Sequence, residues 1–91
     1  MFSNMRYIYE VYKEGSFSKA AKNLYISQPA LSATVKKTES KIGMPLFDRS
    51  RRPLQLTAAG EIYIGTIKKI MGLEQDLDRQ IQDIQNLAAG E

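Results

Sequence analysis

Residues 28–37 contain polar and basic side chains, and one alanine, at a spacing that places them on one face of a helix. Gln28 carries an amide that can form a bidentate pair of hydrogen bonds with adenine, and Ser32 carries a hydroxyl that can bond to several bases. Ala33 lies on the same expected face, and Lys36 and Lys37 carry charges suited to phosphate. These residue types suit a helix that reads base edges in a DNA major groove, and, taken alone, they equally fit a capped surface helix with a purely structural role.

An arginine-rich turn follows at residues 48–53, with the sequence Asp-Arg-Ser-Arg-Arg-Pro. Arg49, Arg51 and Arg52 are suited to insertion beside or into a minor groove, because narrow A·T-rich stretches attract arginine. A Leu-Gln-Leu run comes directly after the turn, and its alternation predicts a short strand on each side. The turn is therefore expected to form a basic wing.

The composition of the 91 residues argues against an enzyme, because the chain has no cysteine and no histidine. Disulfides, zinc fingers, thiol nucleophiles and imidazole bases are thereby excluded. The remaining route to catalysis is a carboxylate pair or a Ser/Lys site, but Asp76, Asp78 and Asp83 fall on an expected exposed helix and not in a pocket. We expect no catalytic residue, no metal and no cofactor.

Charge is divided unevenly along the chain, whose formal net charge is +3. Residues 1–56 carry a net charge of +6 and residues 57–91 one of −3. This division favours a head that meets a polyanion and a stem that meets protein. No apolar run approaches the roughly 18 residues of a spanning helix, and the charged N-terminus is unlike a signal peptide. We expect a cytoplasmic protein with no membrane partner.

Three helices are expected in the head. The first covers residues 3–14, with Ser3 or Asn4 as its cap and an apolar stripe of Met5, Ile8, Tyr9 and Tyr12. The second runs from a cap at Ser18 to Leu24.

The third helix begins at a cap at Ser27 with Pro29 in its first turn, and it ends at Gly43. Leu31, Val35 and Ile42 mark its core face, and Thr38 shares that stripe. Two helices joined by a short turn and followed by a wing predict a winged helix-turn-helix.

The last helix is expected to begin at a Thr57 cap and to run from residue 58 to about residue 88. Heptad positions along it form an apolar seam, which predicts a dimer interface. The seam consists of Tyr63, Ile67, Ile70, Leu77, Ile81 and Ile84. Glu74 interrupts it. Gly65 and Gly72 either mark a close helix contact or lie on the surface.

The order of these features resembles the N-terminal region of LysR-type transcriptional regulators. The matching segments are Arg6-Tyr7, Ser16-Phe-Ser-Lys-Ala-Ala21, Leu24, Ile26-Ser-Gln-Pro-Ala-Leu-Ser32, Ile42-Gly43, Leu46-Phe47 with Arg49, and Leu56-Thr-Ala-Ala-Gly60. The resemblance covers residues 2 to about 88 and implies a winged helix-turn-helix head with a long linker helix that pairs in a dimer. Ala33 stands where the family often has arginine, and Thr38 where it usually has leucine.

The resemblance also implies roles for individual residues. Base contacts fall on Gln28, Pro29, Ser32 and Arg52, to which the outward-facing Ala33 is added. Phosphate contacts fall on Ser16, Phe17, Ser18, Ser27 and Lys36, to which Lys37, Arg49 and Arg51 are added for their charge.

The expected organisation is a DNA-binding head at residues 1–56, followed at residues 57–91 by a dimerising linker helix and the start of a linker. The resemblance implies a further effector-binding domain, so we expect the chain to be part of a longer protein that meets any small-molecule effector elsewhere. The leading hypothesis is a dimer that binds an interrupted pseudo-palindromic DNA site in transcription regulation. The alternative is a protein-interaction module that uses the winged-helix surface or the last helix.

Overall fold

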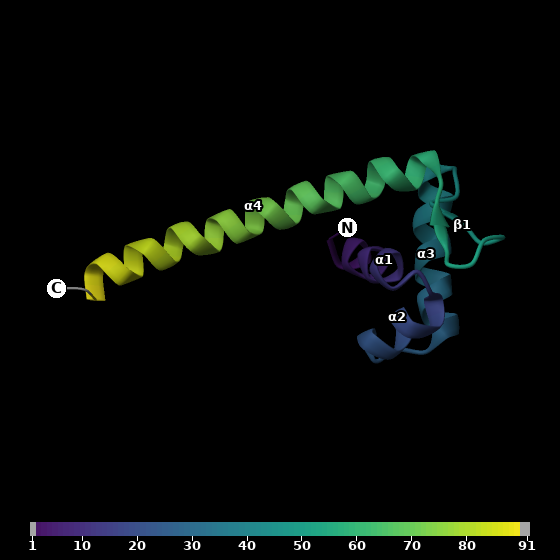
Figure 1. The fold of residues 1–91 in the computed structure, drawn as a ribbon, viewed down its shortest axis with the longest axis horizontal. Helices are drawn as coiled ribbons and strands as arrows, with labels where there is room; N and C mark the ends of the chain where they lie inside the picture. The colour runs from purple at the N-terminus through teal and green to yellow at the C-terminus, as the bar shows by residue number, and fades with distance from the viewer. Residues whose placement is uncertain (1, 90–91) are drawn as a thin grey trace.

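The computed structural model describes the backbone of residues 2–89 and the side chains of residues 4–89. Along these residues, four helices and two short strands follow one another: α1 (Phe2–Glu14), α2 (Phe17–Leu24), α3 (Gln28–Ile42), β1 (Phe47–Asp48), β2 (Gln55–Leu56) and α4 (Ala58–Ala89). Helices α1 to α3 and the wing form the head, and α4 leaves the head as one long rod (Figure 1). The mostly helical fold class with a two-stranded wing is therefore confirmed.

Two predicted helix starts differ from the observed ones. Helix α1 already includes Phe2, so Ser3 and Asn4 lie inside it and do not cap it. Helix α2 is capped by Ser16 and not by Ser18, because the backbone of Ser16 is extended and its Oγ accepts a hydrogen bond from the Lys19 amide (3.2 Å). The head therefore begins its second helix about half a turn earlier than the sequence predicted.

Helix α3 begins and ends where the sequence predicted. The Oγ of Ser27 accepts a hydrogen bond from the Ala30 amide (3.2 Å), and Pro29 occupies the first turn. Gly43 ends the helix with a φ of +85°, a left-handed conformation that glycine adopts without strain. The turn before α3 contains Tyr25, whose φ of 57° makes it the left-handed C-cap of α2.

Each helix of the head contributes apolar side chains to a single core. The buried apolar residues are Ile8, Val11, Ala20, Ala21, Leu31, Val35, Leu46, Phe47, Ile64 and Ile67. Thr38 is buried among them, as its place on the stripe predicted. The prediction for Ile42 was wrong: its side chain is 43% exposed, because it lies in the last turn of α3, where Gly43 and Met44 are also exposed.

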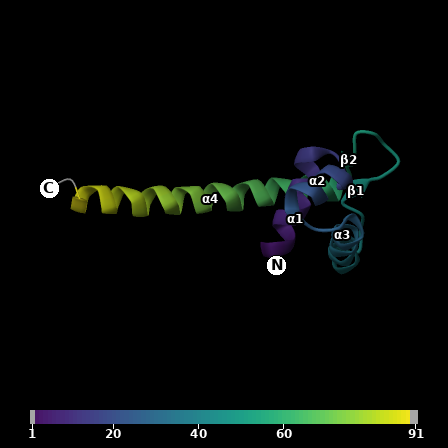
Figure 2. The ribbon, with the colours of Figure 1, turned by 90° about the horizontal axis from the view of Figure 1, so that it is seen from below.

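The wing is a two-stranded antiparallel ribbon in which Phe47 pairs with Leu56 and Asp48 pairs with Gln55. Figure 2 shows its turn projecting from the end of the head that lies away from the C-terminus. The Leu54 amide donates a hydrogen bond to the Gly15 carbonyl (3.1 Å), which attaches the returning strand to the junction of α1 and α2. This hydrogen bond thus holds the wing to the head in addition to the pairing of its two strands.

Helix α4 belongs partly to the head and partly to solvent. The Thr57 side chain caps it by accepting a hydrogen bond from the Gly60 amide (3.0 Å), as predicted. Ile64 and Ile67 complete the core, so packing continues past the predicted boundary at residue 56, which marks only where α4 begins. No helix among the described residues has both the length and the apolar character needed to cross a bilayer.

The glycines of α4 differ in what surrounds them. A Cβ added at Gly60 would collide with the Leu46 carbonyl oxygen, whereas a Cβ at Gly65 or Gly72 would meet no atom within 4 Å. Within the described chain, Gly65 and Gly72 are therefore open positions, and Gly60 is the site of close approach between α4 and Leu46, the residue directly before β1.

We expect Gly60→Ala to destabilise the protein by about 1–3 kcal/mol or more, because the backbone must move to admit the methyl group. Gly65→Ala is the matched control, since it places the same methyl group on the same helix in open space. It should stabilise the protein by about 0.5–1 kcal/mol through higher helix propensity. Urea denaturation followed by circular dichroism measures both free energies. Equal effects of the two substitutions would contradict the close approach at Gly60.

Candidate nucleic-acid interface

The exposed face of α3 carries the residues predicted to contact bases. Gln28, Pro29 and Ala33 are exposed at the start of the helix, and Ser32 is half-buried beside them. Lys36 and Lys37 continue this face toward the C-terminal end and are also exposed. Leu31, Val35 and Thr38 point into the core from the opposite side, so the separation of the two faces holds over the first three turns.

At the start of α2, fewer polar groups are free to contact phosphate than the sequence predicted. The Ser16 hydroxyl caps the helix, and Phe17 is half-buried with its ring edge-on to the ring of Phe47 (centroids 5.9 Å apart, 72° between planes). Ser18 is exposed. What this helix end can offer a phosphate is therefore the Ser18 hydroxyl and the backbone N–H groups of Phe17 and Ser18, since the Lys19 N–H is already bonded to the Ser16 hydroxyl.

The tip of the wing holds two exposed arginines. The Nε of Arg51 lies 3.5 Å from an Asp48 carboxylate oxygen, and Arg52 donates hydrogen bonds to the carbonyls of Arg49 (2.7 Å) and Arg51 (3.0 Å). Hydrogen bonds from the hydroxyl and amide of Ser50 hold the pKa of Asp48 below its usual value, and Arg51 adds to this effect. The turn is therefore organised by its own polar groups and presents Arg51 and Arg52 to solvent.

Arg49 differs from the other two wing arginines. Its Nη2 lies 3.0 Å from the Oε1 of Glu39, and its guanidinium stacks 4.9 Å from the centre of the Phe17 ring. The structure therefore turns Arg49 toward the head, whereas the sequence suggested a phosphate contact. Sequence reasoning also missed Glu39. Its signal was an acid in the last turn of a helix, where the helix dipole disfavours negative charge and a nearby cation is expected.

The predicted seam of α4 divides into a buried part and an exposed part. Ile67 is only 3% exposed and packs in the core, and Tyr63 is half-buried against it, so these two side chains serve the head in the described chain. Leu77, Ile81 and Ile84 are exposed. Leu73 and Leu87 are also exposed, and the predicted seam did not include them because each lies one residue before a heptad position. The exposed apolar stripe of α4 consists of Leu73, Leu77, Ile81, Ile84 and Leu87.

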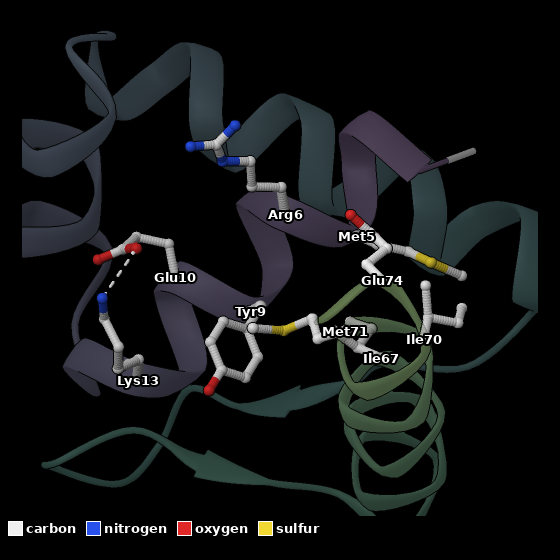
Figure 3. Close-up of a pocket in the computed structure, with 9 residues that line it drawn as sticks. All are labelled: Met5, Arg6, Tyr9, Glu10, Lys13, Ile67, Ile70, Met71 and Glu74. Carbon is white, nitrogen blue, oxygen red and sulfur yellow. Dashed lines mark ion pairs between the residues drawn. The ribbon is translucent and has the colours of Figure 1, made fainter. Parts of the chain in front are cut away.

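A groove of about 560 Å³ lies where α1 meets α4, at the head end of this stripe (Figure 3). Its apolar lining consists of Met5, Tyr9, Ile67, Ile70 and Met71. Its charged lining consists of Arg6, Glu10, Lys13 and Glu74, of which Lys13 and Glu10 form an ion pair (3.3 Å). The apolar surface of α4 is thus continuous from this groove to the exposed stripe.

A head of three helices, a surface-exposed α3 and a basic wing define a winged helix-turn-helix protein. Residues 2–61 match the family model described as bacterial regulatory helix-turn-helix protein, lysR family. The chain belongs to this family, and the resemblance noted in its sequence is thereby confirmed.

Curated relatives of the chain are named as transcriptional regulators. Probable RuBisCO transcriptional regulators of Synechocystis sp. and Trichormus variabilis are each 44% identical to it over 86 residues, and that of Cyanidioschyzon merolae is 41% identical over 86 residues. Each alignment covers 94% of this chain and 25%, 26% and 28% of the respective relative. The chain thus spans about a quarter of the length of the curated relatives that it matches.

Solved structures of LysR-type regulators share the fold. The BenM DNA-binding domain in complex with catB site 1 DNA is 30% identical with a TM-score of 0.78, over 99% of this chain and 94% of that one. The same domain with benA site 1 DNA gives 30% identity and a TM-score of 0.81, over 92% and 98%. Full-length LysG from Corynebacterium glutamicum with bound effector Arg gives 30% and 0.79, over 88% and 27%.

Proposed function

We propose that this chain binds double-stranded DNA sequence-specifically and thereby regulates transcription. The observation that carries the proposal is the exposure of the first turns of α3 beside a wing with two exposed arginines. The BenM domain, which shares the fold, is described in complexes with DNA. Transcription regulation is also the role named for the curated relatives. We assign the protein to the cytoplasm, where its DNA would lie.

The base-contacting residues in this proposal are Gln28, Pro29, Ser32, Ala33 and Arg52. The first four lie on the exposed side of α3, near its N-terminal end, and an α-helix fits the width of the major groove. Arg52 lies in the wing and is assigned to the minor groove. Phosphate contacts are assigned to Ser16, Phe17, Ser18, Ser27, Lys36, Lys37 and Arg51, with Phe17 acting through its backbone. We leave Arg49 out because its guanidinium faces Glu39.

The protein is further proposed to act as a homodimer. One recognition helix makes too little contact for tight specific binding, and two linked heads gain from effective concentration. The exposed apolar stripe of α4 supplies the contact, with Ile70 at its head end, and Tyr63 and Ile67 contribute indirectly through the core. An antiparallel pair is favoured because a parallel one would place Glu74 beside its own copy.

Two heads held in this way would bind an interrupted pseudo-palindrome, with half-sites near multiples of about 10 bp. Selection of bound sequences from a random duplex pool tests this proposal directly. An enriched motif with two half-sites supports it, and a pool without enrichment contradicts sequence-specific binding. We assign any small-molecule effector to a part of the protein outside this chain, since the effector-bound LysG is matched over only 27% of its length.

DNA binding should weaken steeply with salt. Each head offers Lys36, Lys37 and Arg51 to phosphate and Arg52 to the minor groove, so a dimer brings about eight cations to the DNA. Release of the corresponding counterions should lower affinity by about three to five orders of magnitude between roughly 50 and 200 mM salt. Fluorescence anisotropy with a labelled duplex measures this slope, and a flat response would contradict the DNA-binding proposal.

Base reading and backbone contact should separate in two substitutions on α3. Gln28→Ala should cost about 1–3 kcal/mol on the best site, because a bidentate contact is lost, and should leave non-specific binding nearly unchanged. Lys36→Ala, the matched control on the same exposed face, should weaken all sequences by a similar factor. Titration against the selected site and a scrambled duplex measures both effects. Equal losses on both duplexes for both variants would show that the assignment of the α3 face is wrong.

The dimer contact should be broken by Leu77→Asp combined with Ile81→Asp. Both side chains are about half exposed in the single chain (59% and 48%), so the head should keep its fold, whereas a dimer would bury two unpaired charges per chain. Gln75→Asp with Gln82→Asp is the matched control, because it adds the same charge to α4 away from the stripe.

Analytical ultracentrifugation beside a duplex titration measures the outcome of these changes. The stripe variant should sediment as a monomer and bind the full site much more weakly, and the control variant should remain a dimer. A stripe variant that stays dimeric, or a monomer that binds as tightly as the parent, would show that α4 does not hold the dimer together.

A further inference from the structure

The carboxylate of Glu39 joins the recognition helix to the wing through both of its oxygens. Oε2 accepts a hydrogen bond from the Leu46 amide (2.7 Å), and Oε1 faces the Nη2 of Arg49 (3.0 Å). The Glu39 side chain is only 12% exposed, so these two partners replace most of its water. Hydrogen bonds to a charged group are strong, so these two contacts fix the position of the Glu39 carboxylate.

The guanidinium of Arg49 is held on a second side as well. It stacks on the Phe17 ring at the start of α2, and its Nε is buried. Its side chain is 35% exposed, compared with 69% for Arg51. Arg49 is therefore held between α3 and α2 at the point where the chain enters the wing turn, with its Nη2 directed at Glu39 and its Nε buried.

The other end of the wing turn is fixed independently. The Leu54 amide bonds to the Gly15 carbonyl (3.1 Å), and a Cβ at Gly15 would lie 3.3 Å from the Cβ of Pro53. Arg51 and Arg52 thus lie in a short turn that is anchored at both ends. Moving either anchor would move these two arginines relative to the start of α3.

The distance along α3 indicates what this anchoring sets. Glu39 follows Gln28 by eleven residues, which corresponds to about 16 Å along the helix axis. The major groove is about 12 Å wide. For a helix whose start enters the groove end-on, a wing attached at Glu39 lies outside that groove, which places its arginines at the flanking backbone or minor groove.

We propose that Glu39 and Arg49 are positioning residues, which fix Arg51 and Arg52 at a set distance from the base-reading start of α3. In this inference, which rests on the proposed DNA binding, Arg49 makes no phosphate contact of its own. Its positive charge is instead paired with the Glu39 carboxylate. The opposite view is that Arg49 is a third phosphate-binding arginine and that Glu39 is an acid that merely weakens DNA binding.

The two views differ in the sign and salt dependence of their effects. The variants are Glu39→Gln, Arg49→Met and Arg49→Lys, with Arg51→Met as the matched control that removes an exposed wing cation. Binding of each variant of the 91-residue chain is measured by anisotropy at several salt concentrations, on the selected site and on a scrambled duplex. Melting by circular dichroism sets a measurement temperature at which every variant is folded.

We expect Glu39→Gln and Arg49→Met to lower affinity for the selected site about tenfold, with the scrambled duplex and the salt slope unchanged. Their combination should be no worse than either one, because they act through one contact. Arg49→Lys should not restore binding, since lysine keeps the charge but lacks the planar group that pairs and stacks. Arg51→Met should weaken both duplexes and reduce the slope by about two per dimer.

Three results would overturn the proposal. Glu39→Gln could tighten binding to both duplexes, Arg49→Met could reduce the salt slope as Arg51→Met does, or Arg49→Lys could restore full affinity. Each would mean that charge acts directly on DNA.

A measurement without DNA separates this inference from the proposed function. Backbone ¹⁵N relaxation of the free protein should show greater mobility over residues 49–53 in Arg49→Met than in the parent or in Arg51→Met. If the parent binds no duplex, the DNA-binding proposal fails, and the relaxation data still decide whether the contact holds the wing. Unchanged mobility in Arg49→Met would overturn the positioning role.

Discussion

The peptide unit of Leu46 is the point on which the arrangement of this molecule depends. Its side chain is buried in the core, so its backbone polar groups need partners inside the protein. Glu39 at the end of α3 accepts its N–H, and the Thr57 amide donates to its carbonyl (3.0 Å). Gly60 allows α4 to approach that same carbonyl. Contacts of the Leu46 backbone therefore help to orient α3, the wing and α4 relative to one another.

The features that sequence reasoning predicted correctly are those with local causes. The Ser27 cap, the Gly43 stop and the Thr57 cap follow from side chains that bond to backbone within a few residues. One local signal was also misread, because Ser16 and not Ser18 caps α2. The sequence alone does not show which distant segments meet: Ile67 has a heptad position suited to a partner and also packs in the core, and Arg49 has the charge of a phosphate ligand and also lies beside Glu39.

The uneven distribution of charge located the basic part of the chain, but it did not show which of its cations are paired inside the protein and which can contact phosphate. Arg49 and Arg51 stand two residues apart in one turn and differ in what surrounds them. One is held between an acid and an aromatic ring, and the other keeps most of its surface in water. Arg51 also has an acidic neighbour, Asp48, but its exposed charge keeps counterions that phosphate can replace, whereas the more buried Arg49 has fewer to release. Net charge therefore overstates the number of phosphate contacts that a head can make.

Helix α4 has two environments along its 32 residues, and this division follows from the size of the head. The molecule measures 58 × 26 × 22 Å, so a head of that width covers only the first turns of such a helix. The remaining turns keep a stripe of leucine and isoleucine in water, which is unfavourable. Because the Leu46 peptide helps to orient both α4 and the wing, a second chain on the stripe would hold two wings in a defined relation. The contact that covers the stripe would thereby also set the geometry of the DNA-binding surface.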